Sequence, residues 1–251
     1  MASSVKAGDH LYDDPELAGF YDHDNEARAD FEYCLRLAAG ARSVLDLGCG
    51  TGRLAAALAE GRSVAGIDPA GGMLDIARKR PGGQRVEWIQ ADARKIRLDR
   101  RFDLVVLTGH AFQVFLTSDD QAAVLRTIAH HLTPSGRFIF DTRNPAAKEW
   151  LEWGPEASLR FIAHPEFGQV KAWNTAAYDP AIRVVTYETH YEIPDAGRRF
   201  SAASRIAFPT KDSLAELIEE AGLATDRWLG DWQGNGFTPE AREIIPIGRR
   251  R

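Results

Sequence analysis

Three glycines at alternate positions, Gly48, Gly50 and Gly52, follow a short apolar run in segment 44–52, VLDLGCGTG. They stand where a strand is expected to turn into a helix. Glycine accepts positive φ angles there, and it lets a ligand lie against bare backbone at the helix N-terminus. The turn is therefore a candidate ligand-binding loop, although a tight strand–helix connection in any α/β protein would use the same residue type.

The spacing of these glycines excludes two common phosphate-binding loops. Arg53 follows Gly52, so the dinucleotide pattern G-x-G-x-x-G is not matched. No Gly-Lys-Ser or Gly-Lys-Thr follows the turn, which excludes the phosphate-cradling P-loop.

Two acids follow at the ends of the next two predicted strands. Asp68 stands 20 residues after Gly48, where a carboxylate can accept both ribose hydroxyls of an adenosine, as in NAD and adenosylmethionine sites. Asp92 ends the third strand, where it could accept a hydrogen bond from an adenine amino group. Either acid alone could be a helix cap. Together, at the carboxyl ends of successive strands, they predict one adenosine-shaped crevice.

The elements that must position these residues alternate between strand and helix. Strands are predicted at 43–47, 63–67, 86–90, 102–107 and 136–141, and helices at 26–39, 53–60, 72–80 and 119–132. Central runs such as VLDL and LVVL are nearly continuous in apolar residues, as burial on both faces requires. This alternation predicts an α/β fold, a doubly wound parallel sheet with helices on both faces.

The pattern changes after Asn144-Pro145. Four segments rich in Val, Thr, Tyr, Phe and Trp and separated by turn residues predict an antiparallel meander: 159–164, 169–177, 182–193 and 198–208. A helix is then predicted at 211–221, with Ser213 or Asp212 as N-cap and Gly222 just past its end, followed by strands at 224–230 and 244–247.

These patterns divide the chain into three parts. Residues 1–40 are expected to form N-terminal cap helices, residues 41–147 and 209–251 the core domain, and residues 148–208 an inserted subdomain. The insertion could serve as a lid, as a dimer interface or as both, because pocket walls and exposed strand edges draw on the same residue types.

Taken in order, the motifs VLDLGCGTG, GIDPAGGML, QADA, FDLVV and LTPSGRFIFD resemble the class I S-adenosylmethionine-dependent methyltransferases of the small-molecule type. The resemblance covers roughly residues 40–145. It implies a Rossmann-like, mostly parallel seven-stranded sheet whose last strand is antiparallel, which fits segment 244–247. It also implies S-adenosyl-L-methionine as cofactor and S-adenosyl-L-homocysteine as product.

The resemblance implies a set of cofactor-binding residues. The backbone of Gly48, Cys49 and Gly50 would receive the methionine part, with Asp46 near its amine. Residues implied for the rest of the cofactor are Asp68 and Pro69 at the ribose, Met73 packed on adenine, Asp92 and Ala93 at the adenine edge, and Thr108 after the fourth strand. Residues 1–40 would cover the cofactor, and Tyr12 and Tyr21 are candidates to lie near the sulfonium, with plain packing as the alternative.

A second group of residues is expected on the acceptor side. His110, just past the fourth strand, is the candidate general base, because an acceptor amine must be unprotonated and a hydroxyl must lose its proton. A hydrogen-bonded scaffold role is the alternative for this histidine. Asp141, Arg143 and Asn144 end the fifth strand and are candidates for substrate binding, or for capping the loop before Pro145.

The amino-acid composition limits which nucleic-acid, metal and membrane partners are expected. The 251 residues carry 31 Lys and Arg against 36 Asp and Glu, a net charge of -5, so a nucleic-acid partner is not expected. Cys34 and Cys49 lie outside any metal-binding or disulfide spacing, and no metal is expected. No apolar segment approaches the length of a signal sequence or membrane span, so we expect a cytoplasmic protein without membrane contact.

The function expected from the sequence is methyl transfer to a small-molecule acceptor by in-line displacement, in which positioning supplies much of the rate. The acceptor atom could be nitrogen, oxygen or carbon, and a homodimer is possible. A nucleic-acid methyltransferase is an alternative, but segment 108–111, TGHA, lacks the Asp/Asn-Pro-Pro-aromatic motif of the amino-methylating members. A non-catalytic cofactor-binding scaffold or regulator is the alternative outside the enzymes, and an NAD-dependent oxidoreductase is a third.

Overall fold

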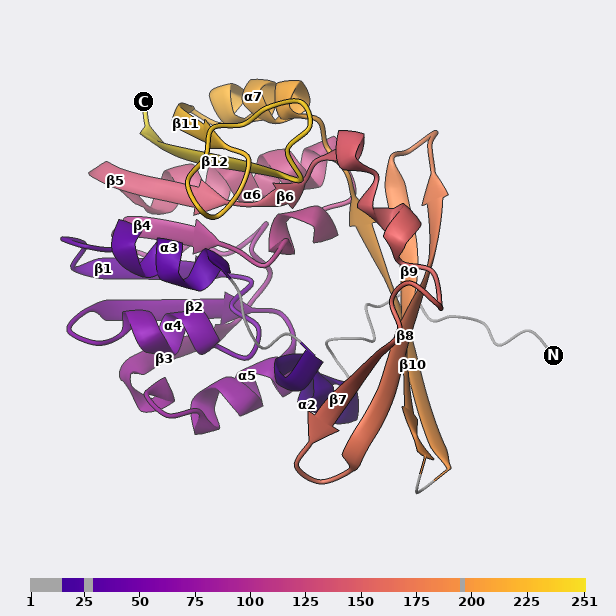
Figure 1. Cartoon of the computed structure of the whole chain (residues 1–251). Coiled ribbons are helices and arrows are strands. Elements are labelled where there is room, and N and C mark those ends of the chain that lie inside the picture. The colour runs from indigo at the N-terminus through magenta and orange to yellow at the C-terminus, as the bar shows by residue number, and fades with distance from the viewer. Residues whose placement is uncertain (1–14, 25–28, 195–196) are drawn as a thin grey trace.

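The computed structural model describes residues 15–24, 29–194 and 197–251, which form an α/β core and a separate antiparallel sheet (Figure 1). Tyr12 lies outside the described residues. No helix in the described ranges is long and apolar enough to span a bilayer.

The central sheet has the strand order β11-β12-β5-β4-β1-β2-β3. Its strands are β1 Ser43–Leu47, β2 Ser63–Asp68, β3 Val86–Gln90, β4 Phe102–Leu107, β5 Leu132–Phe140, β11 Leu223–Leu229 and β12 Glu243–Arg250. Strand β12 runs antiparallel to both of its neighbours, while the pairs from β5 through β3 are parallel. The predicted Rossmann-like sheet with an antiparallel last strand is confirmed, and a short strand β6, Thr142–Arg143, pairs with the start of β12 in addition.

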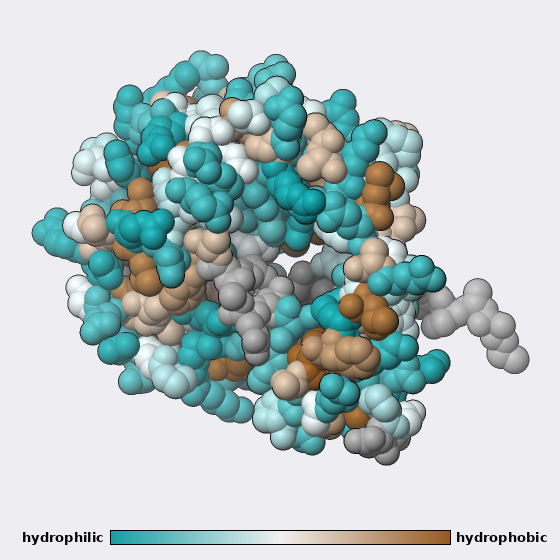
Figure 2. Space-filling model, in the orientation of Figure 1, coloured by the Kyte–Doolittle hydropathy of each residue, from teal (hydrophilic) through white to brown (hydrophobic). Residues whose placement is uncertain are grey.

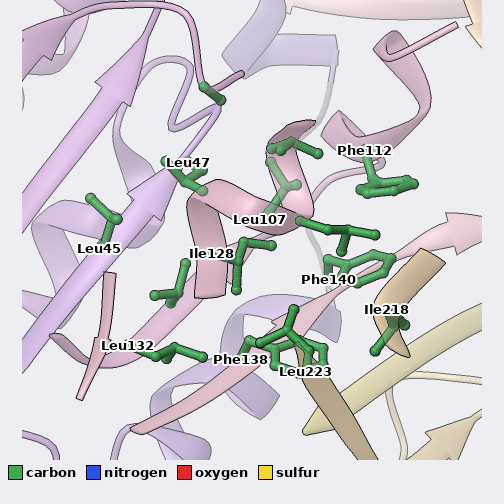
Figure 3. Packing of buried hydrophobic residues seen from close by; sticks show 14 of the residues in the cluster. Leu45, Leu47, Leu107, Phe112, Ile128, Leu132, Phe138, Phe140, Ile218 and Leu223 are labelled. Carbon is green, nitrogen blue, oxygen red and sulfur yellow. The ribbon is translucent and has the colours of Figure 1, made fainter. Parts of the chain in front are cut away.

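Helices cover both faces of this sheet: α3 Ala29–Leu37 and α4 Arg53–Leu58 on one face, and α6 Ser118–His131 and α7 Lys211–Glu220 on the other. Helix α5, Gly71–Lys79, packs along β2 and β3. Side chains alternate along β1, so Leu45 and Leu47 join Ile128 and Ile218 in one cluster (Figure 3), while Val44 packs beneath α3 and α4. By the same alternation Asp46 points toward the face covered by α3 and α4.

The meander predicted after residue 145 is present as a four-stranded antiparallel sheet in the order β10-β9-β8-β7. Its strands are β7 Arg160–His164, β8 Gly168–Asp179, β9 Val184–Ile193 and β10 Arg198–Ala207. Short 3-10 helices η3 Pro145–Ala147 and η4 Glu149–Glu152 lead into it, and η1 Gly83–Arg85 and η2 Ala111–Val114 lie in the core.

Helix α2, Pro15–Asp24, joins the two sheets. Leu17 and Phe20 pack into the hydrophobic cluster on the inner face of the inserted sheet. Asp22 accepts a hydrogen bond of 2.6 Å from the Thr51 hydroxyl and pairs with Arg80 in the core. Two residues later, Asp24 pairs with Arg160 and accepts a hydrogen bond of 3.0 Å from the Tyr191 hydroxyl, both on the inserted sheet. One short helix thus holds both parts of the molecule.

One local prediction was wrong. The N-cap of α7 is Thr210, whose side chain accepts from the backbone amide of Ser213 at 3.2 Å, rather than Ser213 or Asp212. Thr210 keeps the extended conformation of an N-cap, whereas Ser213 already lies in the first helical turn. The predicted end of the helix holds, since Gly222 has φ 78.

We expect Gly52→Ala to lower the free energy of unfolding by about 3 kcal/mol, because two penalties act at this position. Gly52 has φ +75, and an added Cβ would clash with the indole of Trp88 and lie 2.8 Å from Cβ of Ala77. Gly61→Ala is the matched control, since φ is +74 with no atom within 4 Å, and it should lose only about 1 kcal/mol. Urea unfolding measures both, and equal losses would contradict the packing argument.

Candidate active site

A cavity of about 950 Å³ lies between the carboxyl end of the central sheet, helix α2 and the inserted sheet. The surface is hollowed between these two parts of the molecule (Figure 2). Core residues on its wall include Gly48, Gly50, Asp68, Asp92 and His110, and residues from the inserted sheet include Asn174, Tyr187, Thr189, Tyr191 and Ser204. A cavity of this size accommodates a nucleoside-sized ligand together with a second small molecule.

The glycine loop after β1 is tied to the end of β2. The amides of Gly48 and Cys49 donate to the carbonyl of Ile67 at 2.7 and 3.0 Å. The Asp68 carboxylate accepts from the Gly50 amide at 2.8 Å and from the Ala70 amide at 2.9 Å. Two backbone donors therefore fix Asp68 at the cavity wall, and the same contacts shape the loop.

Asp46 lies behind the glycine loop and is 3% exposed. Burial first, then the nearby charges of Asp68 and Asp30, raise its pKa to about 8, against a hydrogen bond from the Ala55 backbone that lowers it. At neutral pH this carboxyl is mostly protonated. A cation arriving on the other side of the loop would favour its ionised form.

The side chain of Cys49 does not reach the cavity. Its Sγ packs toward Gly66 of β2, 3.1 Å from where a Cβ would stand on that glycine, and burial raises the pKa of the thiol. Only the backbone of Cys49 is thus placed to serve a ligand in the loop.

The residues expected around an adenine lie on the wall of the cavity. Pro69, Met73, Asp92 and Ala93 all line it, and Met73 packs with Ala18 of α2. The Asp92 carboxylate is held by the Arg94 guanidinium, with Nη2 to Oδ2 at 2.7 Å, and this contact lowers its pKa. Arg94 also reaches Asp120 at 2.8 Å. Arg94 lines the cavity as well, although no local pattern in the sequence singles it out.

Tyr21 on α2 and Thr108 after β4 line the same cavity. Tyr21 packs against the cluster of Ala18, Ala70 and Met73. Both residues therefore stand where they could contact a ligand held by the glycine loop.

His110 sits in a turn in which it and Gly109 both have positive φ, 63 and 71 respectively. The buried Asp141 carboxylate accepts from the His110 amide at 3.0 and 3.2 Å and thereby holds this turn. The ring Nε2 lies 2.9 Å from Oε1 and 3.1 Å from Oε2 of Glu243, and 3.5 Å from Oδ2 of Asp141. Burial raises the pKa of both carboxyls. Glu243 was not among the residues expected from the sequence, because 133 residues separate it from His110.

The three candidates after β5 lie in different places relative to the cavity. Among them only Arg143 lines the cavity, where it donates to Gln113 at 2.9 Å and to Glu149 at 3.0 Å. Asn144 is 4% exposed, caps η3 through the Ala146 amide and donates to two carbonyls before β12. The capping alternative therefore describes Asn144, and Asp141 reaches the cavity only through His110.

Comparison with known proteins gives consistent matches. Residues 44–136 match the family described as "Methyltransferase domain". The chain is 28% identical to a cypemycin N-terminal methyltransferase from Streptomyces sp, over 84% of each chain. It is 26% identical to a dTDP-4-amino-2,3,4,6-tetradeoxy-D-glucose N,N-dimethyltransferase from Saccharopolyspora spinosa, over 94% of this chain and 93% of that one. The CcbJ methyltransferase of Streptomyces caelestis shares the fold, with TM-score 0.79, 23% identity and 99% of each chain covered.

We expect the stability of the free protein to fall as pH rises from 5 to 8, and Asp46→Asn to remove part of this fall. The folded state keeps the Asp46 proton up to a pKa of about 8, whereas the unfolded chain releases it near the ordinary aspartate pKa of 3.8. The folded state thus binds more protons in this range, and Asp46 should contribute up to about 1 kcal/mol per pH unit.

Urea unfolding of both proteins at pH 5, 6.5 and 8 measures the effect. Asp103→Asn is the control. Backbone hydrogen bonds from Arg42 and Ser43 lower the pKa of Asp103, so its carboxylate is ionised throughout this range and the substitution should change the free energy of unfolding equally at all three pH values. An Asp46→Asn variant that keeps the full pH dependence of the wild type would contradict the assigned protonation.

Proposed function

The chain belongs to the class I S-adenosylmethionine-dependent methyltransferases, and we propose that it transfers a methyl group to a nitrogen atom of a small polar acceptor. The observation that carries this proposal is one cavity whose core wall is the glycine loop with Asp68 and whose opposite wall is the hydrogen-bonding face of the inserted sheet. His110, which is held by the carboxylates of Asp141 and Glu243, lines the same cavity.

The residues of the core wall fit S-adenosylmethionine. Gly48 and Gly50 have φ 66 and 53, and no atom lies within 4 Å of where a Cβ would stand on Gly50, so the loop leaves room for a ligand against its backbone. We assign the methionine part to this loop, with Cys49 contributing backbone only, and the ribose to Asp68. Asp46 behind the loop would compensate the positive charge of the methionine amine.

The adenine is assigned to the end of the cavity lined by Pro69, Met73, Asp92 and Ala93, with Tyr21 and Thr108 nearer the loop. When bound, S-adenosylmethionine supplies a methyl carbon on a positively charged sulfur, and the C–S electron pair goes to sulfur as the acceptor lone pair forms the new bond in line.

The acceptor is assigned to the inserted sheet. Register places Thr189 of β9 between Asn174 of β8 and Ala202 of β10, and Tyr187 beside Ser204, all on the inner face. These amide and hydroxyl groups suit an acceptor with several polar substituents. The nitrogen-methylating relatives act, by their names, on the N-terminus of cypemycin and on a dTDP-amino sugar. An amino sugar or a peptide amine therefore has the chemistry we propose.

His110 is proposed as the base of the reaction. An amine reaches the enzyme largely as an ammonium ion and must lose a proton before its lone pair can attack, so a nearby imidazole supports the rate. Residues 148–208 are proposed to act as the lid that holds the acceptor against His110. Their outward face, where Phe161 is 61% exposed, is the surface we propose for a homodimer.

Binding of S-adenosylhomocysteine tests the assigned cofactor site. We expect micromolar binding at pH 7 with release of close to one proton, because the incoming amine drives ionisation of Asp46, whose pKa in the free protein is about 8. Affinity should therefore rise with pH up to about 8. Calorimetry in buffers of different ionisation enthalpy measures the released proton, and Asp46→Asn should abolish it. Binding without proton release in the wild type would refute the role of Asp46.

Methyl transfer tests the proposed acceptor. We expect S-adenosylmethionine-dependent methylation in a panel of nucleotide-linked amino sugars and peptides with free N-termini, detected by mass spectrometry. His110→Ala should lower kcat about 100-fold and leave the Kd of S-adenosylhomocysteine within twofold. Methylation confined to hydroxyl or carbon acceptors would overturn the nitrogen assignment, and loss of cofactor binding in His110→Ala would make this histidine a scaffold residue.

A further inference from the structure

Glu243 is placed at the active site by the direction of its strand. Because β12 runs antiparallel to its neighbours, its first residue lies at the edge of the sheet where the parallel strands end. Glu243 pairs in register with Arg143 of β6, so these two side chains share one face of the ribbon. Asp141, two residues before Arg143, lies on that face too. The fold thus brings two carboxylates from distant segments to His110.

The two carboxylates hold different parts of this histidine. Asp141, 1% exposed, accepts from the His110 backbone amide and so fixes the left-handed turn that carries the side chain. Glu243 faces the ring, with both carboxylate oxygens within 3.1 Å of Nε2. Asp141 thus holds the backbone of His110 and Glu243 makes the shorter contacts with its ring, with Oδ2 of Asp141 at 3.5 Å from Nε2.

We propose that Glu243 is a positioning residue that keeps the Nε2 atom of His110 protonated and makes Nδ1 the atom that accepts the proton of the acceptor amine. A carboxylate has no proton to donate in its ionised form, so a ring nitrogen that bonds to it must carry the hydrogen. In a neutral imidazole the other nitrogen then holds the basic lone pair. This inference rests on the proposed function of His110 as the base.

The proton transfer balances without a further reactant. An N–H bond of the acceptor ammonium breaks, its electron pair stays on nitrogen, and the proton bonds to Nδ1 of His110. The resulting imidazolium donates from Nε2 to Glu243, whose negative charge stabilises the cation. Transfer of the Nδ1 proton to water restores the neutral ring.

The charges around His110 fit this role. Asp141 and Glu243 face it directly, and Asp30 on α3 acts on both of these carboxyls. Burial, and after it Asp30, raise the pKa of Glu243 to about 7, although Arg143 and Arg242 lower it, so this carboxyl is mostly ionised at pH 8. When the ring becomes cationic it favours the ionised form still further.

The tautomer can be measured without any acceptor. In protein labelled with ¹⁵N-histidine, we expect NMR at pH 8 to show His110 protonated at Nε2 and unprotonated at Nδ1. His131 is an internal reference of the opposite kind, because its Nε2 accepts from the Leu98 amide at 2.8 Å and its Nδ1 donates to the Thr127 carbonyl at 2.8 Å. The His110→Gln spectrum assigns the signals. A His110 ring protonated at Nδ1 would overturn the proposal.

Substitutions of Glu243 then test the effect on the base. Glu243→Gln keeps the size of the side chain but removes its charge, so the NMR titration midpoint of His110 should fall by about one pH unit. The acidic limb of the kcat profile should move with it, kcat should fall about tenfold, and KM should stay within twofold. Glu243→Asp, which restores the charge, should recover part of both effects. The exposed Glu240 provides the matched control, Glu240→Gln, which should change neither.

The outcomes separate the two proposals. If no acceptor nitrogen is methylated, the proposed function fails, yet the tautomer and the titration midpoint still decide the role of Glu243. An unchanged midpoint and pH profile in Glu243→Gln would overturn the positioning role even if His110→Ala is inactive. Should Glu243→Gln fail to fold, the wild-type tautomer and the Glu243→Asp titration remain decisive.

Discussion

Negative charge gathered at one edge of the central sheet is the constraint on which the site depends. Asp46 and Asp68 come from β1 and β2, Asp141 follows β5, and Glu243 begins β12. Burial of such carboxyls is unfavourable unless each finds hydrogen bonds, a counter-charge or a proton. Asp68 has backbone donors, Glu243 has His110 and arginines, and Asp46 retains its proton. The parallel strands bring Asp46, Asp68 and Asp141 to the same edge of the sheet, and the antiparallel last strand adds Glu243 there.

The second requirement is that the inserted sheet faces this edge at a fixed distance. Helix α2 fixes this distance on one side, because Asp22 is bound to the core and Asp24 is bound to β7 and β9. Gln113 fixes the distance on another side, because its buried amide donates to the Ala207 carbonyl of β10 at 2.7 Å and accepts from Arg143. Polar contacts of defined geometry thus set the width of the cavity, and the apolar packing of Leu17 and Phe20 stabilises the arrangement.

The sequence predicted the elements closely because their patterns are local. Apolar runs, turn residues and the glycine loop mark β1 to β4 and the meander to within two residues, whereas β5 begins at Leu132, four residues before its predicted start; Asp68 and Asp92 stand at predictable strand ends. The partners of these residues depend on tertiary structure. Glu243 carries no local motif, and it meets His110 only because β12 inserts between β11 and β5. In the sequence Arg94 resembles any charged loop residue. Only the tertiary structure shows that it bonds to both Asp92 and Asp120 and lines the cavity.

The protonation of this edge also indicates what kind of ligand it suits. Burial raises the pKa of the carboxyls at this edge, and Asp46 holds a proton that a nearby positive charge can displace. An anionic ligand would deepen the repulsion among them, whereas a sulfonium, an ammonium or an imidazolium relieves it. Since an amine substrate enters as a cation and leaves a proton behind, an acidic edge with a histidine at its surface suits both states. The acidic edge thus suits the amine acceptor proposed above as well as the positive charges of the cofactor.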